Sequence, residues 1–487
     1  PSAAYLKRFP PRWVIAFGRS LQTRATVDGL ARELAELREQ AARAGLPRPA
    51  VCCDLEEGAG LHFPEATRLA PALALAAADA GGDGAALFVA GELTAREARA
   101  LGVELVLAPV VDVNTRRDNP IIATRSFGDE PDAVARRARA WLDGLARGGA
   151  LGCLKHFPGH GDTEKDSHTE LPLVAKTRAE FDACELVPYR ELLTRPPAAL
   201  GAVMVAHLDV PALTAAPGEP TSLSRRAVGE LLRGELGWDG LVMTDGLAMG
   251  ALARQDDFHA RALSAGCDLL LGPPSAERAA EELLAALRRG VLARADLERA
   301  AARAERLAER ALSEPSEPAS SELVADALAL AQASIVLGPG GWSGPAGMLQ
   351  PVHGPAADPL LRLEPLTSAH QPAPGGMRVF AAACLVGCGR GRAGLEAEVE
   401  RELVLCIERE LARGGRAGLL WFGSPQVLPE GLWGLAGLSI ALCHAPSEPL
   451  QRAAAAGLRE SFARTRGRLP VAQPEAGPVA DAPGAAR

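Results

Sequence analysis

The segment Lys155–Pro172, KHFPGHGDTEKDSHTELP, gathers three of the nine histidines of the chain together with several carboxylates. It contains two prolines and two glycines, which are incompatible with a regular helix, so we expect a loop. Three interpretations compete for such a segment: a metal site, an acid/base site, or a polar surface loop without chemistry.

A metal site draws on the imidazoles and carboxylates of this loop. Catalytic zinc usually takes ligands at a short rigid spacing, such as HExxH on a helix, and the loop contains no such spacing. We therefore predict no metal. The possible ligands are His156, His160, Asp162, Asp166 and His168.

An acid/base site is favoured by the pair Asp166 and His168, which are separated by one residue. A carboxylate that accepts an imidazole N–H fixes the tautomer of the ring and leaves the other nitrogen free to move a proton. The loop also follows a candidate strand ending at Lys155-His156. In a parallel barrel such strand ends face the active site.

A general acid needs a chemical partner, and LVMTDGLAMG (Leu241–Gly250) offers Asp245 at the end of an apolar run. A carboxylate at this place can cap the following helix. It can also attack an electrophilic carbon and form a covalent intermediate. Position alone leaves both roles open.

The elements that must position these groups alternate between short apolar runs and helical stretches from residue 13 to about 312. This alternation predicts an α/β fold, a (β/α)8 TIM-like barrel over residues 1–312, and several of its strands end in a polar residue, as a catalytic barrel requires. The strand-end residues are Asp54, Asp112, His156, His207 and Asp245. The expected strands are 13–17, 50–54, 103–112, 150–156, 202–207, 241–245 and 268–271, and the expected helices are 23–44, 130–147 and 276–312.

Residues 313–321, SEPSEPASS, have the composition of a linker. Beyond it, residues 322–470 are predicted to form a smaller C-terminal α/β sandwich domain, and 471–487 a flexible tail. Its expected strands are 334–337, 378–385, 418–422 and 438–443, with a helix over 395–413. The Gly- and Pro-rich stretch 338–374 is predicted to be irregular.

Composition and charge exclude some functions. The net charge of −8 and the absence of a basic, aromatic-interleaved run argue against a nucleic-acid partner. Nine cysteines without a disulfide or CxxC pattern favour a reducing, cytoplasmic location. The first residues predict neither a signal peptide nor a membrane span, although the chain does not begin with Met. The oligomeric state is left open.

Several long motifs resemble glycoside hydrolase family 3 β-N-acetylhexosaminidases of the NagZ type in their two-domain form. The resemblance runs from about residue 12 to 312, and more loosely through LLWFGSPQVL (419–428) and APSEPLQRAAAAGL (445–458). The motifs that carry it are KHFPGHGDTEKDSHTELP, VMVAHLDVPAL (203–213), SLSRRAVGELLRGELGWDGLVMTDGLAMGAL (222–252) and APVVDVNTRRDNPIIATRSFGDEP (108–131).

The resemblance implies a retaining exo-β-N-acetylglucosaminidase without a cofactor, acting on peptidoglycan-derived muropeptides during cell-wall recycling. Asp245 would be the nucleophile, and His168 backed by Asp166 the general acid/base. The implied sugar-binding residues are Asp54, Arg125, Lys155 and His156. Physically, an imidazole with a pKa near its ordinary value of about 6.5 can donate to a leaving oxygen and then accept from water at neutral pH.

The chain departs from the family pattern in two places. The usual turn DQEGGRVQRF reads DLEEGAGLHF here, so Ala59 and His62 replace two arginines, the second of which normally touches substrate. By its position, His62 is predicted to be a fifth substrate-binding residue. The acidic neighbour of the nucleophile is Gly246. Three alternatives stay open. One is a β-glucosidase of the same family. Another is a phosphorylase in which phosphate replaces water, because a histidine acid/base adds no negative charge that would repel an anion. The third is an inactive sugar-binding relative, which the altered turn at Ala59 and His62 suggests.

Overall fold

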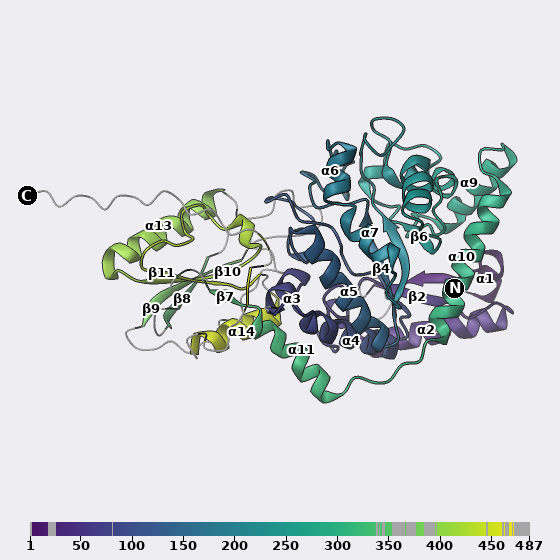
Figure 1. Ribbon diagram of the computed structural model, residues 1–487. Helices are drawn as coiled ribbons and strands as arrows, with labels where there is room; N and C mark the ends of the chain where they lie inside the picture. The colour runs from purple at the N-terminus through teal and green to yellow at the C-terminus, as the bar shows by residue number, and fades with distance from the viewer. Residues whose placement is uncertain are drawn as a thin grey trace, which may run out of the picture.

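The computed structural model describes residues 2–17, 26–79, 81–337, 346–352, 376–383, 397–444 and 447–459, with a few short stretches between 339 and 471. Two sheets lie side by side, each flanked by helices (Figure 1). The larger, N-terminal part is an α/β fold, as the alternation of apolar runs and helices predicts. No helix among the described residues is long and apolar enough to cross a membrane.

The first sheet is parallel and follows chain order from β1 to β6. It curls into a half-barrel, and Met243 of its last strand makes one further parallel bridge to Leu269. Closure into eight strands, as expected from the sequence, is not seen among the described residues: 268–271 contributes only this bridge. The strands are β1 (Trp13–Ile15), β2 (Ala50–Cys53), β3 (Leu105–Val106), β4 (Leu151–Phe157), β5 (Leu200–Val205) and β6 (Leu241–Thr244).

Helices cover the outside of this half-barrel. Two of them, α4 (Ala85–Ala100) and α5 (Pro131–Arg147), approach so closely that a Cβ on Gly91 would lie 2.1 Å from the carbonyl oxygen of Trp141. The stretch predicted as one helix over 276–312 is two, because the chain turns at Gly290 with φ of +71°. The remaining helical segments are α1 (Ala3–Arg8), α2 (Val27–Arg43), η2 (Ala59–Leu61), α3 (Ala72–Ala78), η3 (Ala123–Arg125), α6 (Arg178–Ala183), α7 (Val187–Thr194), η4 (Thr221–Leu223), η5 (Arg226–Glu235), η6 (Gly250–Leu252), α8 (Phe258–Ala265), α9 (Ala276–Arg288) and α10 (Arg294–Ser313).

The second sheet has the order β7-β11-β10-β9-β8, and only β7 runs antiparallel to its neighbour. In Figure 1, α13 (Ala397–Gly414) lies on one face and α14 (Glu448–Arg459) on the other. The prediction that 338–374 is irregular is wrong at β8, which its Gly- and Pro-rich surroundings conceal in the sequence. The predicted tail, 471–487, lies outside the described residues except for Val471. The other elements are α11 (Ser321–Ala333), β7 (Val336–Leu337), β8 (Ala346–Val352), β9 (Met377–Ala383), β10 (Ala417–Phe422), η8 (Pro425–Val427) and β11 (Leu438–Leu442).

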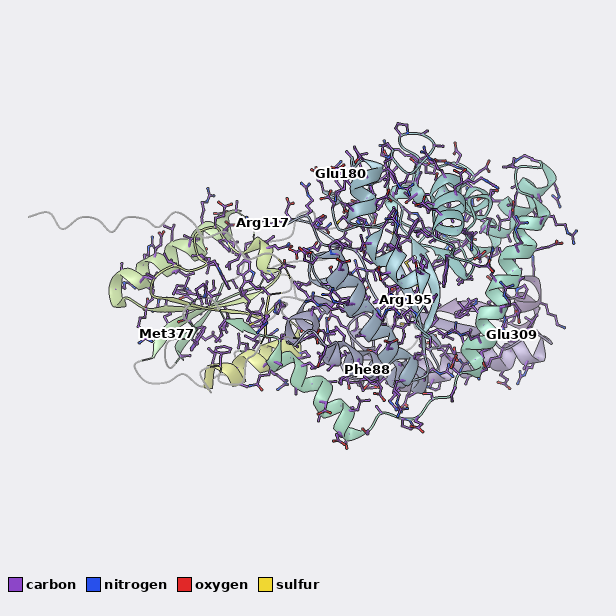
Figure 2. All side chains as sticks on the ribbon, in the orientation of Figure 1. Phe88, Arg117, Glu180, Arg195, Glu309 and Met377 are labelled. Atoms are coloured by element: carbon purple, nitrogen blue, oxygen red, sulfur yellow. The ribbon has the colours of Figure 1, made fainter. Side chains whose placement is uncertain are left out.

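The segment that joins the two parts is fixed to the first one. Arg99 of α4 donates hydrogen bonds to the carbonyl oxygens of Ala311 and Glu314, at 2.9 and 3.0 Å. A Cβ on Gly149 would lie 1.9 Å from the carbonyl oxygen of Pro315. A second contact brings the parts together at Arg117, labelled at the junction in Figure 2, which donates to the carbonyl oxygen of Leu428 at 3.1 Å. The start of the predicted linker therefore packs against the first part, and the two parts meet at a separate contact.

Candidate active site

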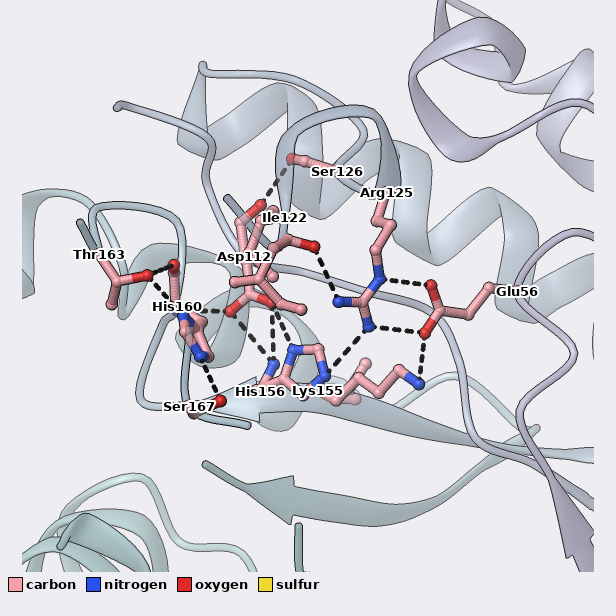
Figure 3. A network of polar contacts seen from close by, with 12 residues as sticks. Glu56, Asp112, Ile122, Arg125, Ser126, Lys155, His156, His160, Thr163 and Ser167 are labelled. Carbon is pink, nitrogen blue, oxygen red and sulfur yellow. Dashed lines mark hydrogen bonds and ion pairs between the residues drawn. The ribbon is translucent and has the colours of Figure 1, made fainter. Parts of the chain in front are cut away.

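One ion-pair network lies at the carboxyl ends of β2 and β4 and joins four charged residues, Asp54, Glu56, Arg125 and Lys155. Figure 3 shows the contacts of Glu56 with Arg125 and Lys155. The Lys155 ammonium lies 2.7 Å from Asp54 Oδ1 and 2.6 Å from Glu56 Oε1. The Arg125 guanidinium binds both oxygens of Glu56, each at 2.8 Å. Such forked geometry fixes the planes of both groups. The network presents rigid donors and acceptors, which is what recognition of sugar hydroxyls requires.

The network also fixes the charges of its members. Burial opposes ionisation of Glu56, but Arg125 and Lys155 hold its pKa well below the ordinary value. Burial likewise opposes the charged form of Lys155, yet Asp54 and Glu56 raise the pKa of the ammonium. Lys155 therefore stays cationic although its side chain is only 2% exposed.

Asp112 accepts hydrogen bonds from both His156 and the loop that follows it. Its carboxylate is fully buried and accepts from His156 Nδ1 at 2.7 Å and from the backbone N–H of His160, also at 2.7 Å. Because the guanidinium of Arg125 can only donate, and lies 3.4 Å from His156 Nε2, that nitrogen must be the acceptor. Burial raises the pKa of Asp112, but the two imidazoles and the His160 N–H lower it below its ordinary value.

The pair Asp166 and His168 has the geometry predicted from the sequence. Asp166 Oδ1 accepts from His168 Nδ1 at 2.8 Å and from the His168 backbone N–H at 2.9 Å. The carboxylate is 2% exposed and the imidazole 41% exposed, so the second ring nitrogen can reach a ligand. The loop is docked on the turn that follows β6, because Gly250 N–H donates to the carbonyl oxygen of His168 at 3.0 Å.

Asp245 follows β6 directly. The N–H of Gly246 donates to Asp245 Oδ1 at 2.7 Å, and the carbonyl oxygen of Gly246 contacts Nε2 of the buried His207 at 3.2 Å. Burial opposes ionisation, but His156, His207, the Gly246 N–H and Lys155 hold the pKa of Asp245 below its ordinary value. The carboxylate is therefore ionised at neutral pH and lies within electrostatic reach of the Lys155 and His156 cluster.

The fifth predicted binding residue, His62, lies on the turn that follows Glu56. Its ring packs edge-on against Phe17 and Phe63, with centroids 5.8 and 6.3 Å away. The ring is partly buried by these aromatics, so its environment differs from that of the charged network around Lys155. Its predicted role in substrate binding stays a prediction.

Four residues that hold this site together were not predicted to be catalytic or sugar-binding from the sequence. They are Glu56, Asp112, His160 and His207. Asp112 and His207 already stood out as polar residues that end predicted strands. His160 contacts Thr163 Oγ1 at 2.8 Å and Ser167 Oγ at 3.0 Å, so it shapes the loop between Asp112 and His168. Burial lowers the pKa of His160 to about 4, which keeps the ring neutral.

The fold and the site together define an α/β enzyme with its polar groups at the carboxyl ends of parallel strands. Among the described residues, no group of three or more His, Cys, Asp or Glu is arranged to hold a metal ion. Residues 12–307 match the model of the glycosyl hydrolase family 3 N-terminal domain, and the chain belongs to this family of glycoside hydrolases.

Individual relatives agree with the family assignment. The chain is 35% identical over 281 residues to a β-hexosaminidase from Chromobacterium violaceum, and the aligned region spans 56% of this chain and 74% of the relative. It resembles the solved structure of a family 3 β-N-acetylglucosaminidase from Paenibacillus sp. FPU-7 at a TM-score of 0.78 and 25% identity, over 97% of this chain and 95% of that one. The β-glucoside phosphorylase BglX shares the fold at a TM-score of 0.75 and 20% identity, over 91% and 87% of the two chains.

Proposed function

We propose that this glycoside hydrolase is a retaining exo-β-N-acetylglucosaminidase, which removes terminal β-linked N-acetylglucosamine. One observation supports the proposal: an ionised Asp245 lies within electrostatic reach of Lys155 and His156, and the loop that bears Asp166 and His168 is hydrogen-bonded to the turn after Asp245. The name of the 35% identical relative, a β-hexosaminidase, supports the choice of sugar.

In this proposal the sugar is held by the network at the ends of β2 and β4. Asp54 and Lys155 would accept from and donate to its hydroxyls, and Arg125 and His156 would complete the set. Asp54 is the carboxylate of the network with the more exposed side chain, 27% against 16% for Glu56, and so is the better placed to bind substrate. Glu56 orients Arg125 and Asp112 orients His156 through hydrogen bonds.

The chemistry follows from the charges. A carboxylate oxygen of Asp245 attacks the anomeric carbon while the bond to the leaving oxygen breaks, and His168 Nε2 gives that oxygen its proton. Water then attacks the anomeric carbon of the glycosyl ester, passing a proton back to His168 and releasing Asp245. His168 is therefore an imidazolium before the first step, a neutral imidazole while the glycosyl ester exists, and an imidazolium again after the second step. Asp166 accepts from Nδ1 throughout, which stabilises the cationic form and keeps the neutral ring in the tautomer whose Nε2 can accept a proton. Two displacements at one carbon retain the configuration.

We further propose the domain bounds, the natural substrates and the location of the enzyme. We place the catalytic domain at residues 1–312, the linker at 313–321 and a C-terminal α/β domain at 322–470. The natural substrates would be peptidoglycan-derived muropeptides in the cytoplasm. The cytoplasmic location is supported by the cysteines of the described residues, all of which are free thiols.

A panel of aryl glycosides tests the proposed activity. The 4-nitrophenyl β-N-acetylglucosaminide should be cleaved about tenfold faster than the β-glucoside or more, because the acetamido group can form a hydrogen bond that the glucoside lacks, and one such bond contributes up to about 1.5 kcal/mol. Addition of phosphate should leave the product as free sugar. Preferred cleavage of the glucoside, or a sugar phosphate as product, would favour the β-glucosidase or phosphorylase alternative, and binding without turnover an inactive relative.

A further inference from the structure

The two parts of the chain share a buried amide pair next to the proposed active site. Asn114 Nδ2 donates to Gln426 Oε1 at 2.6 Å, and Gln426 Nε2 donates to the carbonyl oxygen of Asn114 at 3.3 Å. Asn114 is fully buried and Gln426 is 9% exposed. A buried amide that loses its hydrogen bonds destabilises the protein. The two side chains therefore favour the placement of the two parts in which both hydrogen bonds form.

Gln426 is held rigidly by its own side of the junction. It lies in η8, just after β10, where Ser424 Oγ accepts from the Gln426 N–H at 3.3 Å. The carbonyl oxygen of Ser424 in turn accepts from the indole N–H of the buried Trp421 at 3.0 Å. The position of the amide therefore follows the position of the second sheet.

Asn114 belongs to a loop that packs directly on the segment carrying the proposed acid/base. It comes two residues after Asp112, which accepts hydrogen bonds from His156 and His160. The intervening Val113 touches Gly161 so closely that a Cβ there would lie 1.8 Å from the Val113 carbonyl oxygen. Asn119 of the same loop donates to the carbonyl oxygen of His160 at 2.9 Å.

We propose that Gln426 is a positioning residue for catalysis: through Asn114 it sets the placement of the loop 156–168 against the sugar site. The second sheet then completes the acid/base geometry without supplying a reacting group. This inference rests on the proposed role of His168 as acid/base. It predicts that loss of the Gln426 amide impairs proton transfer more than sugar binding.

The variant Gln426→Leu removes the amide with little change of volume. Acid assistance matters most for poor leaving groups, so kcat/KM for phenyl β-N-acetylglucosaminide should fall about tenfold, the size expected for one buried hydrogen-bonded pair. The value for the 2,4-dinitrophenyl glycoside should fall less than about twofold. Amide hydrogen exchange in 158–168 should become faster, a readout that needs no substrate.

Gln451→Leu is the matched control, because Gln451 is also a buried amide of the C-terminal part and contacts the backbone N–H of Leu366, away from Asn114. It should leave the ratio of the two kcat/KM values and the exchange of 158–168 unchanged. An unchanged ratio and unchanged loop exchange in Gln426→Leu would overturn the inference, and so would equal effects of both variants. If the wild-type protein cleaves none of the glycosides but Gln426→Leu still speeds loop exchange, the proposed function is refuted, whereas the inference that Gln426 positions the loop is upheld.

Discussion

Replacement of Asp112 by Asn tests whether a buried carboxylate sets the tautomer of His156. Oδ1 of Asp112 accepts from the His160 N–H at 2.7 Å, whereas Oδ2 accepts from His156 Nδ1, also at 2.7 Å. Asparagine can keep one acceptor, and two backbone N–H groups compete for it on the Oδ1 side. Its NH₂ group then faces His156 Nδ1, where the wild-type protein has an acceptor.

The consequence reaches Arg125. If His156 Nδ1 becomes the acceptor, Nε2 carries the proton and opposes a guanidinium N–H that lies 3.4 Å away. A hydrogen bond to a charged group contributes about 1.5–3 kcal/mol, so transition-state binding should weaken by about 2–3 kcal/mol. We expect kcat/KM for an aryl β-N-acetylglucosaminide to fall about 100-fold.

Steady-state kinetics on the folded variant measure this loss. Asp79→Asn is a matched control, because Asp79 is also a buried carboxylate that accepts a backbone N–H, that of Gly84 at 3.0 Å, but it contacts no member of the site. The control should keep kcat/KM within about twofold. An Asp112→Asn enzyme with the wild-type value would refute the argument that this carboxylate orients the sugar-binding imidazole.

Two further predictions concern stability. Glu56→Gln leaves the cations of Lys155 and Arg125 without their shared carboxylate, so the free energy of unfolding in urea should fall by about 3 kcal/mol. The control Glu57→Gln breaks only the ion pair with the half-exposed Arg68 and should lower it by less than about 1 kcal/mol. Equal losses would contradict the role of Glu56 as the carboxylate that both cations share. Burial lowers the pKa of His160 and of His444 to about 4, so the unfolded chain binds more protons than the folded one between about pH 6.5 and 4, and the free energy of unfolding should fall over this window as the pH drops, by roughly 3 kcal/mol for each ring. His444→Asn, which suits the left-handed backbone at φ 59°, should flatten this slope, and an unchanged slope would disprove the contribution of His444.

The sequence predicts well what depends on local pattern. The strands β2, β4, β5 and β6 lie within two residues of their predicted positions, because continuous apolar runs bounded by polar residues have few alternatives. The break at Gly290 and the strand Ala346–Val352 were not predicted. One depends on a single backbone angle, and the other lies among glycines and prolines that favour turns.

At the site, the pairing of Asp166 with His168 could be predicted because the two residues are close in the chain and at the end of a strand. The partners of Lys155 and His156 could not be assigned in this way. Glu56 and Asp112 reach them across the sheet, from 99 and 44 positions earlier in the chain. Only the strand register decides which strand-end carboxylate meets which cation. The contact of Gln426 with Asn114, 312 residues apart, depends likewise on how the two parts pack.

The most direct test of the proposed mechanism is to trap the covalent intermediate. A 5-fluoro N-acetylglucosaminyl fluoride should slow hydrolysis of the glycosyl ester more than its formation. Intact-protein mass spectrometry should then show one added sugar, and peptide mapping should place it on Asp245. Attachment to another residue would contradict the role of Asp245, as would turnover that releases the opposite anomer without any covalent adduct.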